Sequence, residues 1–352
     1  MNPLKLGTKV LLNLNNKMNH IAIKGAIFLL LSVITLSSCS GEPSPTKMSG
    51  YTMGTTFSII FYKPEVDNAK LKAKIGKLFN DFDQAMSNWN KKSWVVAFNN
   101  AKKGVKHDVP EEALRVLELC LDLNEKSEGY FDITISPLLD VWGFGSKKQH
   151  RIPTKEEIES ISQLMGRDKI VFSKTEKSIY KTVDGLEINC SAVAKGYGVD
   201  LVVALLQKHG IKYYMVEIGG EVRATTKKNG EAWNIGIPIP KKGGGDKLQR
   251  VIDLKNNAMA TSGDYNNFFT IEGKTYPHII NPKTGFPVEH NLCSVSIIAP
   301  SCALADGLAT ACLVLGKEKG MILLEKFKDC KGYFIERDEK GQFKSSFSKS
   351  FK

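Results

Sequence analysis

The stretch Ser294–Leu315, SVSIIAPSCALADGLATACLVL, contains the pattern that decides the fold. Its first part, Ser294–Ala299, is short, apolar and rich in β-branched residues, which predicts a buried strand. Its second part, Ala303–Leu315, predicts a helix that ends at Gly316, because glycine commonly follows the last helical residue. A strand followed directly by a helix is therefore expected in the C-terminal part of the chain.

Strands dominate the chain from Tyr213 onward. The other strands expected in this part are Tyr213–Ile218, Trp233–Ile239, Arg250–Leu254, Phe268–Ile271 and Gly332–Glu336, and one further helix is expected over Lys317–Phe327. The run Lys241–Asp246, KKGGGD, predicts a flexible loop.

Helices dominate the first half, after one strand predicted over Tyr51–Tyr62. Helices are expected over about Asp67–Met86, from near Pro110 to Gly129, from Thr154 to Gly166 with a capping box of Thr154 and Glu157, and from about Ala194 to His209. Because helices concentrate early and strands late, we predict an α+β fold with a mainly antiparallel sheet packed with helices. We expect a single large domain and leave a bilobal arrangement open.

The composition excludes several classes of protein. Of 352 residues, 42% are hydrophobic and 24% are charged, which is typical of a globular protein and not of a disordered, collagen-like or polytopic membrane protein. The net charge of +12 comes from scattered lysines, and no DNA-reading motif accompanies it. A solvated basic surface accounts for this charge, although an anionic ligand or lipid is also compatible with it.

The N-terminus resembles that of an exported lipoprotein. An apolar run, Gly25–Leu36, follows Lys24 and is too short to span a bilayer permanently, as in a signal peptide. The sequence Leu36-Ser37-Ser38-Cys39 resembles a bacterial lipobox, so we expect residues 1–38 to be removed and Cys39 to carry lipid. A plain secretory signal is the alternative, and the true start is either Met1 or Met18.

These features predict the division of the chain. A tether over 39–48 would precede a domain over 49–345 and a tail over 346–352, with the domain facing the periplasm from the inner or the outer membrane. The six remaining cysteines show no CxxC or zinc spacing and occupy mostly apolar stretches, so buried thiols are expected and one disulfide bridge is left open.

Asp306 and Thr310 are separated by one helical turn, so both side-chain oxygens lie on one face. A carboxylate and a hydroxyl suit Mg²⁺, which takes few protein ligands and completes its shell with waters and phosphate oxygens. The alternative is that Asp306 caps the helix while Thr310 bonds back to its own helix.

The segment Asn189–Asp200, NCSAVAKGYGVD, predicts a strand end, a turn of small residues and a helix start. Backbone amides and a helix N-terminus attract anions, and Lys195 would add a full charge. A tight turn without a ligand is the alternative, and no GxGxxG dinucleotide motif occurs here.

Two further segments are candidates for the site. His278, just before a Pro/Gly turn, could accept a proton from a hydroxyl nucleophile, or it could be structural. The aromatic and glycine residues of Gly129–Pro137 and Trp142–Gly145 could clamp a planar ring or form a corner of the core, and the same applies to Met53 and Trp89.

Together, in this order, these motifs resemble the FAD:protein FMN transferase family, often called ApbE-type. The resemblance spans about Gly50 to Phe334, and the matching segments are Met53–Thr55, Gly129–Pro137 with Trp142–Gly145, Ala194–Tyr197 with Asp200, Ile218–Arg223, Ser262–Tyr265, His278–Gly285, and Ala305–Gly307 with Ala309-Thr310.

The resemblance implies one FAD site with Mg²⁺ at the pyrophosphate. It implies that Asp306, Thr310 and the backbone carbonyl of Ala192 hold the metal, and that His278 is the base or positions the phosphate. The flavin contacts that it implies are Met53, Trp89, Tyr130, Phe131, Asp132, Asn189, Lys195 and Ile280. The chain departs from the family at Asn189 and Asn281, where the family usually has Asp.

The activity implied by the resemblance is transfer of FMN from FAD to a threonine hydroxyl of another protein, with release of AMP. The implied acceptor carries a Ser-Gly-Ala-Thr-like segment, as in a subunit of a membrane redox pump. Two alternatives remain open at this point: hydrolysis of FAD to FMN and AMP, and a lipoprotein that binds flavin without chemistry. A nucleic-acid partner is not expected.

Overall fold

A computed structural model describes residues 44–63, 65–145, 149–241 and 247–351. Its framework is an eight-stranded sheet in which each neighbouring pair is antiparallel. In spatial order the strands are β1 (Thr46–Thr52), β2 (Thr55–Phe61), β6 (Tyr214–Ile218), β7 (Glu221–Ala224), β10 (Asn257–Gly263), β13 (Leu292–Ala299), β14 (Lys331–Arg337) and β15 (Phe343–Phe347). The predicted α+β class with a mainly antiparallel sheet is confirmed.

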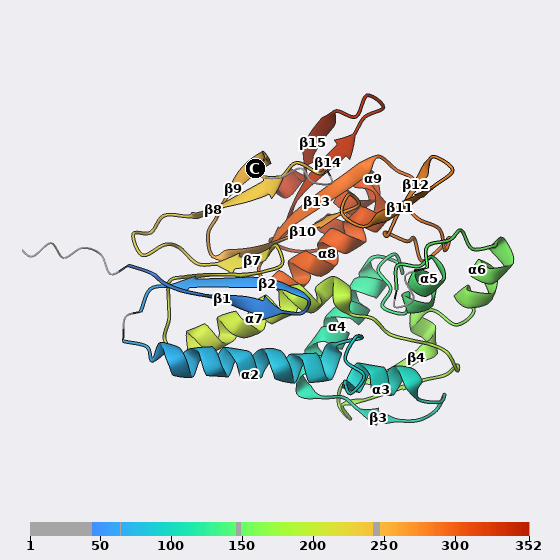
Figure 1. Cartoon of the computed structure of the whole chain (residues 1–352), viewed down its shortest axis with the longest axis horizontal. Coiled ribbons are helices and arrows are strands. Elements are labelled where there is room, and N and C mark those ends of the chain that lie inside the picture. The colour runs from blue at the N-terminus through green and yellow to red at the C-terminus, as the bar shows by residue number, and fades with distance from the viewer. Residues whose placement is uncertain (1–43, 64, 146–148, 242–246, 352) are drawn as a thin grey trace, which may run out of the picture. The chain divides into compact units, whose positions relative to one another are not determined.

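Three helices cover one face of this sheet, as Figure 1 shows: α7 (Ser191–Lys208), α8 (Cys302–Leu315) and α9 (Lys317–Glu325). Two more, α2 (Asn68–Met86) and α4 (Glu111–Lys126), pack against α7 and α8 from the outer side. Helix α8 is buried on nearly all sides because it contacts β10 and β13 on one side and α7 and α4 on the others. This explains why its sequence is almost entirely apolar or small.

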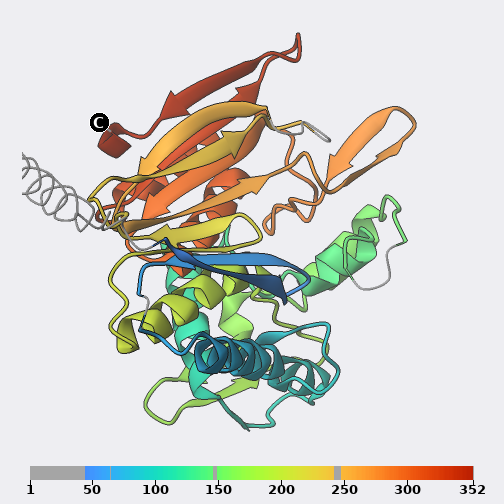
Figure 2. The ribbon, with the colours of Figure 1, turned by 60° about the vertical axis from the view of Figure 1, so that its left-hand side comes forward.

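A hairpin of β8 (Trp233–Pro238) and β9 (Leu248–Leu254) covers part of the opposite face, where it buries apolar side chains against β7, β10 and β14. Figure 2 shows a second hairpin, of β11 and β12, that extends away from the sheet. The remaining elements are α3 (Trp94–Asn100), β3 (His107–Asp108), α5 (Ser136–Val141), α6 (Lys155–Ser162), η1 (Arg167–Lys169), β4 (Ile170–Ser173), β5 (Ser178–Lys181), β11 (Phe268–Ile271), β12 (Lys274–Pro277) and η2 (Lys349–Phe351).

The single strand predicted over Tyr51–Tyr62 is wrong, because the chain turns back at Met53 and Gly54 and separates β1 from β2. Both turn residues have positive φ, 50° and 73°, as a two-residue hairpin loop requires. The predicted strand missed this turn because Met-Gly is not one of the usual turn pairs. The hairpin places Met53 at the end of a strand pair, where it can reach the helices.

Helix α6 has the predicted capping box between Thr154 and Glu157, but it ends at Ser162, before Gly166. Helix α7 begins at Ser191, three residues before the predicted start. The side chain of Asn189 explains this earlier start, because its Oδ1 accepts a hydrogen bond from the Ser191 amide at 2.9 Å.

Several predictions fall outside the described residues, namely the signal peptide over 1–38, the lipid site Cys39, residues 39–43 of the tether and residues 242–246 of the predicted loop. Strand β1 begins at Thr46, so residues 46–48 are not part of a tether. Within the described part of the chain, the six cysteines are free and buried, as predicted. No helix there is long and apolar enough to cross a membrane.

Candidate functional site

A cavity of about 410 Å³ opens between the sheet and the helices beside α8, and we call it the α8 cavity. Six segments that are distant in the sequence form its wall. They are Tyr130–Ile133, Asn189–Lys195 at the start of α7, Thr261–Gly263 at the end of β10, Asn266–Asn267, His278–Ile280, and Asp306 with Thr310 on α8. Of the predicted site residues, the structure brings ten together here: Tyr130, Phe131, Asp132, Asn189, Ala192, Lys195, His278, Ile280, Asp306 and Thr310.

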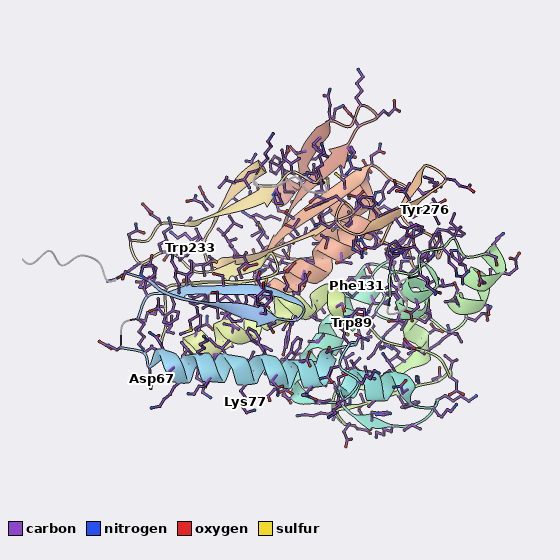
Figure 3. All side chains as sticks on the ribbon, viewed as in Figure 1. Asp67, Lys77, Trp89, Phe131, Trp233 and Tyr276 are labelled. Atoms are coloured by element: carbon purple, nitrogen blue, oxygen red, sulfur yellow. The ribbon has the colours of Figure 1, made fainter. Side chains whose placement is uncertain are left out.

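A second cavity of about 520 Å³ lies beside the C-terminal end of α2, and we call it the α2 cavity. The predicted flavin contacts Met53 and Trp89 line it, and Trp89 is 67% exposed just after α2 ends (Figure 3). Ser191 and Lys195 line both cavities. The two cavities therefore form one two-part cleft that meets at the first turns of α7.

Asp306 is the most deeply buried acid of the cleft, with 3% of its surface exposed. Its Oδ2 accepts a hydrogen bond from the Gly196 amide at 3.0 Å, and its Oδ1 lies 3.8 Å from Nζ of Lys195. Burial raises the pKa of Asp306, since a carboxylate loses hydration there. A buried carboxylate with one distant ammonium is a favourable place for a further cation.

The residues around Asp306 fit Mg²⁺. Thr310 lines the same cavity one turn later on α8, and its Oγ1 lies 3.1 Å from Oγ of Ser262. The Gly196 amide, which donates to Asp306, also faces the carbonyl oxygen of Ala192, because Ala192 is four residues earlier on α7. The Ala192 carbonyl therefore lies near the Asp306 carboxylate. One carboxylate, one hydroxyl and one carbonyl oxygen make the sparse, hard ligand set that Mg²⁺ accepts. Among the described residues, no cluster of three or more His, Cys, Asp or Glu side chains occurs that could hold a metal ion.

Lys195 bridges two buried acids. Its Nζ lies 2.8 Å from Oε1 of Glu221 on β7, as well as 3.8 Å from Asp306. Burial raises the pKa of Glu221 to about 8, with repulsion from Asp306 as the second cause. Burial alone would lower the pKa of Lys195, but Asp306 and Glu221 outweigh it and raise that pKa. Lys195 is therefore a cation in the wall that the two cavities share.

His278 faces the α8 cavity as a neutral imidazole. Its Nδ1 lies 2.9 Å from the carbonyl oxygen of Asn267, which can only accept, so Nδ1 carries the proton. This leaves Nε2 as an acceptor. Burial lowers the pKa of His278 and outweighs the bond to Asn267, so the ring stays uncharged near neutral pH. Such a histidine can accept a proton from a hydroxyl group.

The aromatic segment divides between the site and the core. Tyr130 and Phe131 line the α8 cavity, and Asp132 beside them is held by hydrogen bonds from the amide and hydroxyl of Thr134 at 2.8 and 2.7 Å. Trp142 is fully buried and donates from Nε1 to the carbonyl of Gly285 at 2.8 Å. The positions of Tyr130 and Phe131 fit the first interpretation, a contact with a planar ring of a ligand. The position of Trp142 fits the second, a corner of the hydrophobic core.

Comparison with known proteins identifies the family of the chain. The sequence profile of the ApbE family matches residues 53–334. The chain belongs to the ApbE family. A relative from Haemophilus influenzae named FAD:protein FMN transferase is 34% identical over 338 residues, 94% of this chain and 97% of the relative.

Solved ApbE structures share the fold. The flavin transferase ApbE from Vibrio cholerae superposes with a TM-score of 0.78 at 34% sequence identity. The match covers 88% of this chain and 98% of the Vibrio cholerae chain. The apo form of the flavinyl transferase ApbE from Pseudomonas stutzeri gives 0.79 at 31% identity, and covers 88% of this chain and 96% of its own.

The two departures from the ApbE pattern have local explanations. Oδ1 of Asn189 accepts from the Ser191 amide at 2.9 Å, and Oδ1 of Asn281 accepts from the Lys283 amide at 2.9 Å. An aspartate would make the same turns, since both side chains bond the backbone two residues on. Asn281 does not line the α8 cavity, so only the change at Asn189 lowers the negative charge of the cleft.

Glu221 and Ser262 had no predicted role, although both lie in segments that match the family. Glu221 is 2% exposed and contacts Lys195, and Ser262 bonds Thr310. No local pattern marked Glu221, since β7 has the sequence EVRA, in which two of four residues are charged.

Proposed function

We propose that this chain is an FAD:protein FMN transferase that moves FMN from FAD to a threonine hydroxyl of an exported or membrane redox protein and releases AMP. The observation that carries the proposal is the cleft itself. Two cavities with aromatic walls meet at Lys195, next to the buried acid Asp306. FAD has the matching form, with two ring systems joined by a pyrophosphate.

The position of the pyrophosphate follows from charge. Lys195 and the N-terminal end of α7 lie in the wall that the cavities share, and both favour an anion. The aromatic residues then contact the rings on either side, with Tyr130 and Phe131 in the α8 cavity and Trp89 in the α2 cavity.

Asp306, Thr310 and the carbonyl of Ala192 would hold Mg²⁺ in this cleft. When bound, Mg²⁺ withdraws negative charge from the pyrophosphate and so assists departure of AMP. Lys195 contributes a fixed positive charge to the same group, and Glu221 holds its ammonium in place at 2.8 Å.

The chemical step uses His278. Its unprotonated Nε2 accepts the proton of the acceptor hydroxyl while the hydroxyl oxygen attacks the FMN phosphorus. The bond from that phosphorus to the bridging oxygen breaks, and AMP leaves with the electron pair. The products are AMP and a phosphodiester between FMN and the threonine side chain.

The same site suits water as the nucleophile, which would make the chain an FAD hydrolase. A lipoprotein that binds flavin without chemistry is the further alternative, but a carrier does not require a metal-binding acid beside the scissile bond. The proposal includes export, a lipid anchor on Cys39 and an acceptor with a Ser-Gly-Ala-Thr-like segment, for which the sequence motifs are the support.

The experiment combines the full-length protein, FAD and Mg²⁺ with an acceptor protein that carries a Ser-Gly-Ala-Thr segment. A matched acceptor has valine in place of the threonine. We expect mass spectrometry to detect one added FMN on the threonine acceptor only, with an equal amount of AMP. AMP release without any adduct would identify the hydrolase, and FAD binding without AMP release would identify the carrier.

A further inference from the structure

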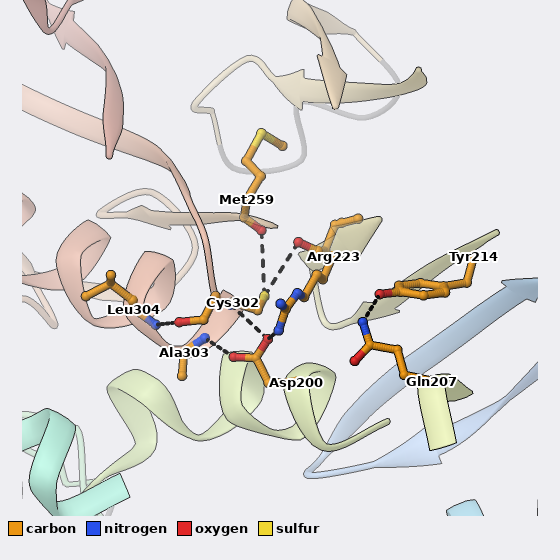
Figure 4. Close-up of polar contacts among 10 residues, drawn as sticks. Asp200, Gln207, Tyr214, Arg223, Met259, Cys302, Ala303 and Leu304 are labelled. Carbon is orange, nitrogen blue, oxygen red and sulfur yellow. Dashed lines mark hydrogen bonds and ion pairs between the residues drawn. The ribbon is translucent and has the colours of Figure 1, made fainter. Parts of the chain in front are cut away.

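Asp200 lies on α7, outside the two cavities, and binds the first turn of α8 (Figure 4). Its Oδ1 accepts from the amide of Cys302 at 3.0 Å, and its Oδ2 accepts from the amide of Ala303 at 2.9 Å. Arg223 of β7 donates from Nη1 to the same carboxylate. One side chain therefore joins α7, α8 and the sheet.

This contact leaves no role in anion binding for the N-terminus of α8. Of its four leading amides, Cys302 and Ala303 donate to Asp200, while Leu304 and Ala305 donate to the side chain and carbonyl of Ser301. Because all four amides already have acceptors within the protein, this helix end has no free amide that could bind a ligand.

The contacts between α7 and α8 follow a regular spacing. Asp200 contacts residues 302 and 303, and Gly196, one turn earlier on α7, donates to Asp306, one turn later on α8. One turn further in each direction are Ala192 and Thr310, which line the α8 cavity. The helices thus run antiparallel along one seam, with Asp200 at one end and the metal ligands at the other.

Gly196 makes the seam tight. A Cβ atom at this position would collide with the backbone carbonyl of Cys302. With so close an approach, the axial position of α8 on α7 sets how far Asp306 and Thr310 lie from Ala192. A slip of one residue moves a helix by about 1.5 Å along its axis, which is large compared with the tolerance of a metal site.

We propose that Asp200, supported by Arg223, is a positioning residue that fixes the register of α8 on α7 and thereby assembles the Mg²⁺ ligands Asp306, Thr310 and Ala192. The proposal rests on the proposed function, because it takes the metal from there. Asp200 does not touch the metal or FAD.

The test compares Asp200→Asn with Ser301→Ala in the full-length protein. Both changes remove a bond to the first turn of α8. Only the first weakens the contact of α8 with α7 and Arg223, because asparagine lacks the second acceptor oxygen, which binds the Ala303 amide, and the negative charge that Arg223 faces. Binding of Mn²⁺, used in place of Mg²⁺, is followed by loss of the free-ion EPR signal, and thermal unfolding is measured in parallel. We expect D200N to weaken Mn²⁺ binding about 10-fold or more, as outer-shell changes at metal sites do.

We expect S301A to lower the unfolding temperature while Mn²⁺ affinity stays that of the original protein. Equal affinity in D200N, or equal losses in D200N and S301A, would overturn the positioning role. If D200N does not fold, Arg223→Gln decides: a smaller loss of Mn²⁺ affinity supports the proposal, and unchanged affinity overturns it. Failure of the original protein to bind Mn²⁺ would instead reject the proposed function.

Discussion

The α8 cavity and the α2 cavity differ in how their walls are held. In the α8 cavity, Asp306 is 3% exposed and sits on a helix packed between the sheet, α7 and α4. In the α2 cavity, Trp89 is 67% exposed and follows the end of α2, opposite a hairpin turn at Met53. Lys195 belongs to both.

From this difference we expect the chemical step in the α8 cavity and mainly FAD binding in the α2 cavity. A group that acts on reacting atoms needs a fixed position and low hydration. The core supplies both for Asp306, and the bond to Asn267 fixes the ring of His278. A group that covers a ring needs only a flat apolar surface, and an exposed indole supplies it. Changes in the α8 cavity should therefore reduce turnover, while changes in the α2 cavity should reduce affinity for FAD.

The strongest test of this contrast is Asp306→Asn against Asp83→Asn, the same change in each cavity. We expect D306N to lower kcat about 1,000-fold, since loss of the metal's charge stabilisation corresponds to about 4 kcal/mol. The amide of Gly196 keeps an acceptor, and a desolvated charge disappears, so the unfolding temperature should not fall. Steady-state AMP release and circular dichroism provide the measurements.

Asp83 lines the α2 cavity and accepts from Nδ2 of Asn90 at 2.7 Å. D83N should leave the proposed Mg²⁺ requirement unchanged. A similar loss of kcat in both variants would mean that charge anywhere in the cleft matters, and the contrast between the cavities would fail.

The second test concerns pH. His278 must be neutral to accept a proton, and burial lowers its pKa below the usual 6.5. We therefore expect kcat/KM for FAD to stay level around neutrality and to fall only as pH drops below 6.5, when the imidazole gains its proton. His278→Gln should lower kcat about 100-fold and remove this acidic limb. A limb that persists in H278Q would assign the titration to another group.

The sequence predicted most of the residues that line the α8 cavity because they lie in strong local patterns. Asp306 and Thr310 are one turn apart on a helix with clear ends, and that helix appears within a residue of its predicted start. Helical spacing alone places two such side chains on one face. The family resemblance then supplied members that no local pattern marked, among them Ala192 and Ile280.

What the sequence did not predict depends on contacts between distant segments. Strand β10, with the sequence NAMATSG, has no alternation of apolar and polar residues, because α8 covers one of its faces and the β8/β9 hairpin packs on the other. The carboxylate of Asp200 meets α8 more than a hundred residues away. The hairpin turn at Met53 was missed for a local reason, since a non-glycine residue with positive φ is uncommon.

The smallest expected effect tests the α2 side with Trp89→Ala. Removal of an aromatic ring that stacks on a base costs about 1.4 kcal/mol, so KM for FAD should rise about 10-fold. Stability should change by less than about 0.5 kcal/mol, since most of the indole is exposed. Because the α8 cavity is untouched, kcat should stay within about twofold, and Trp89→Phe should restore most of the affinity by keeping a flat ring. Initial rates across a range of FAD concentrations separate the two parameters.

A fall in kcat with KM unchanged would place Trp89 among the groups that act on the reacting atoms. The division of the cleft into a reacting side and a binding side would then have to be abandoned.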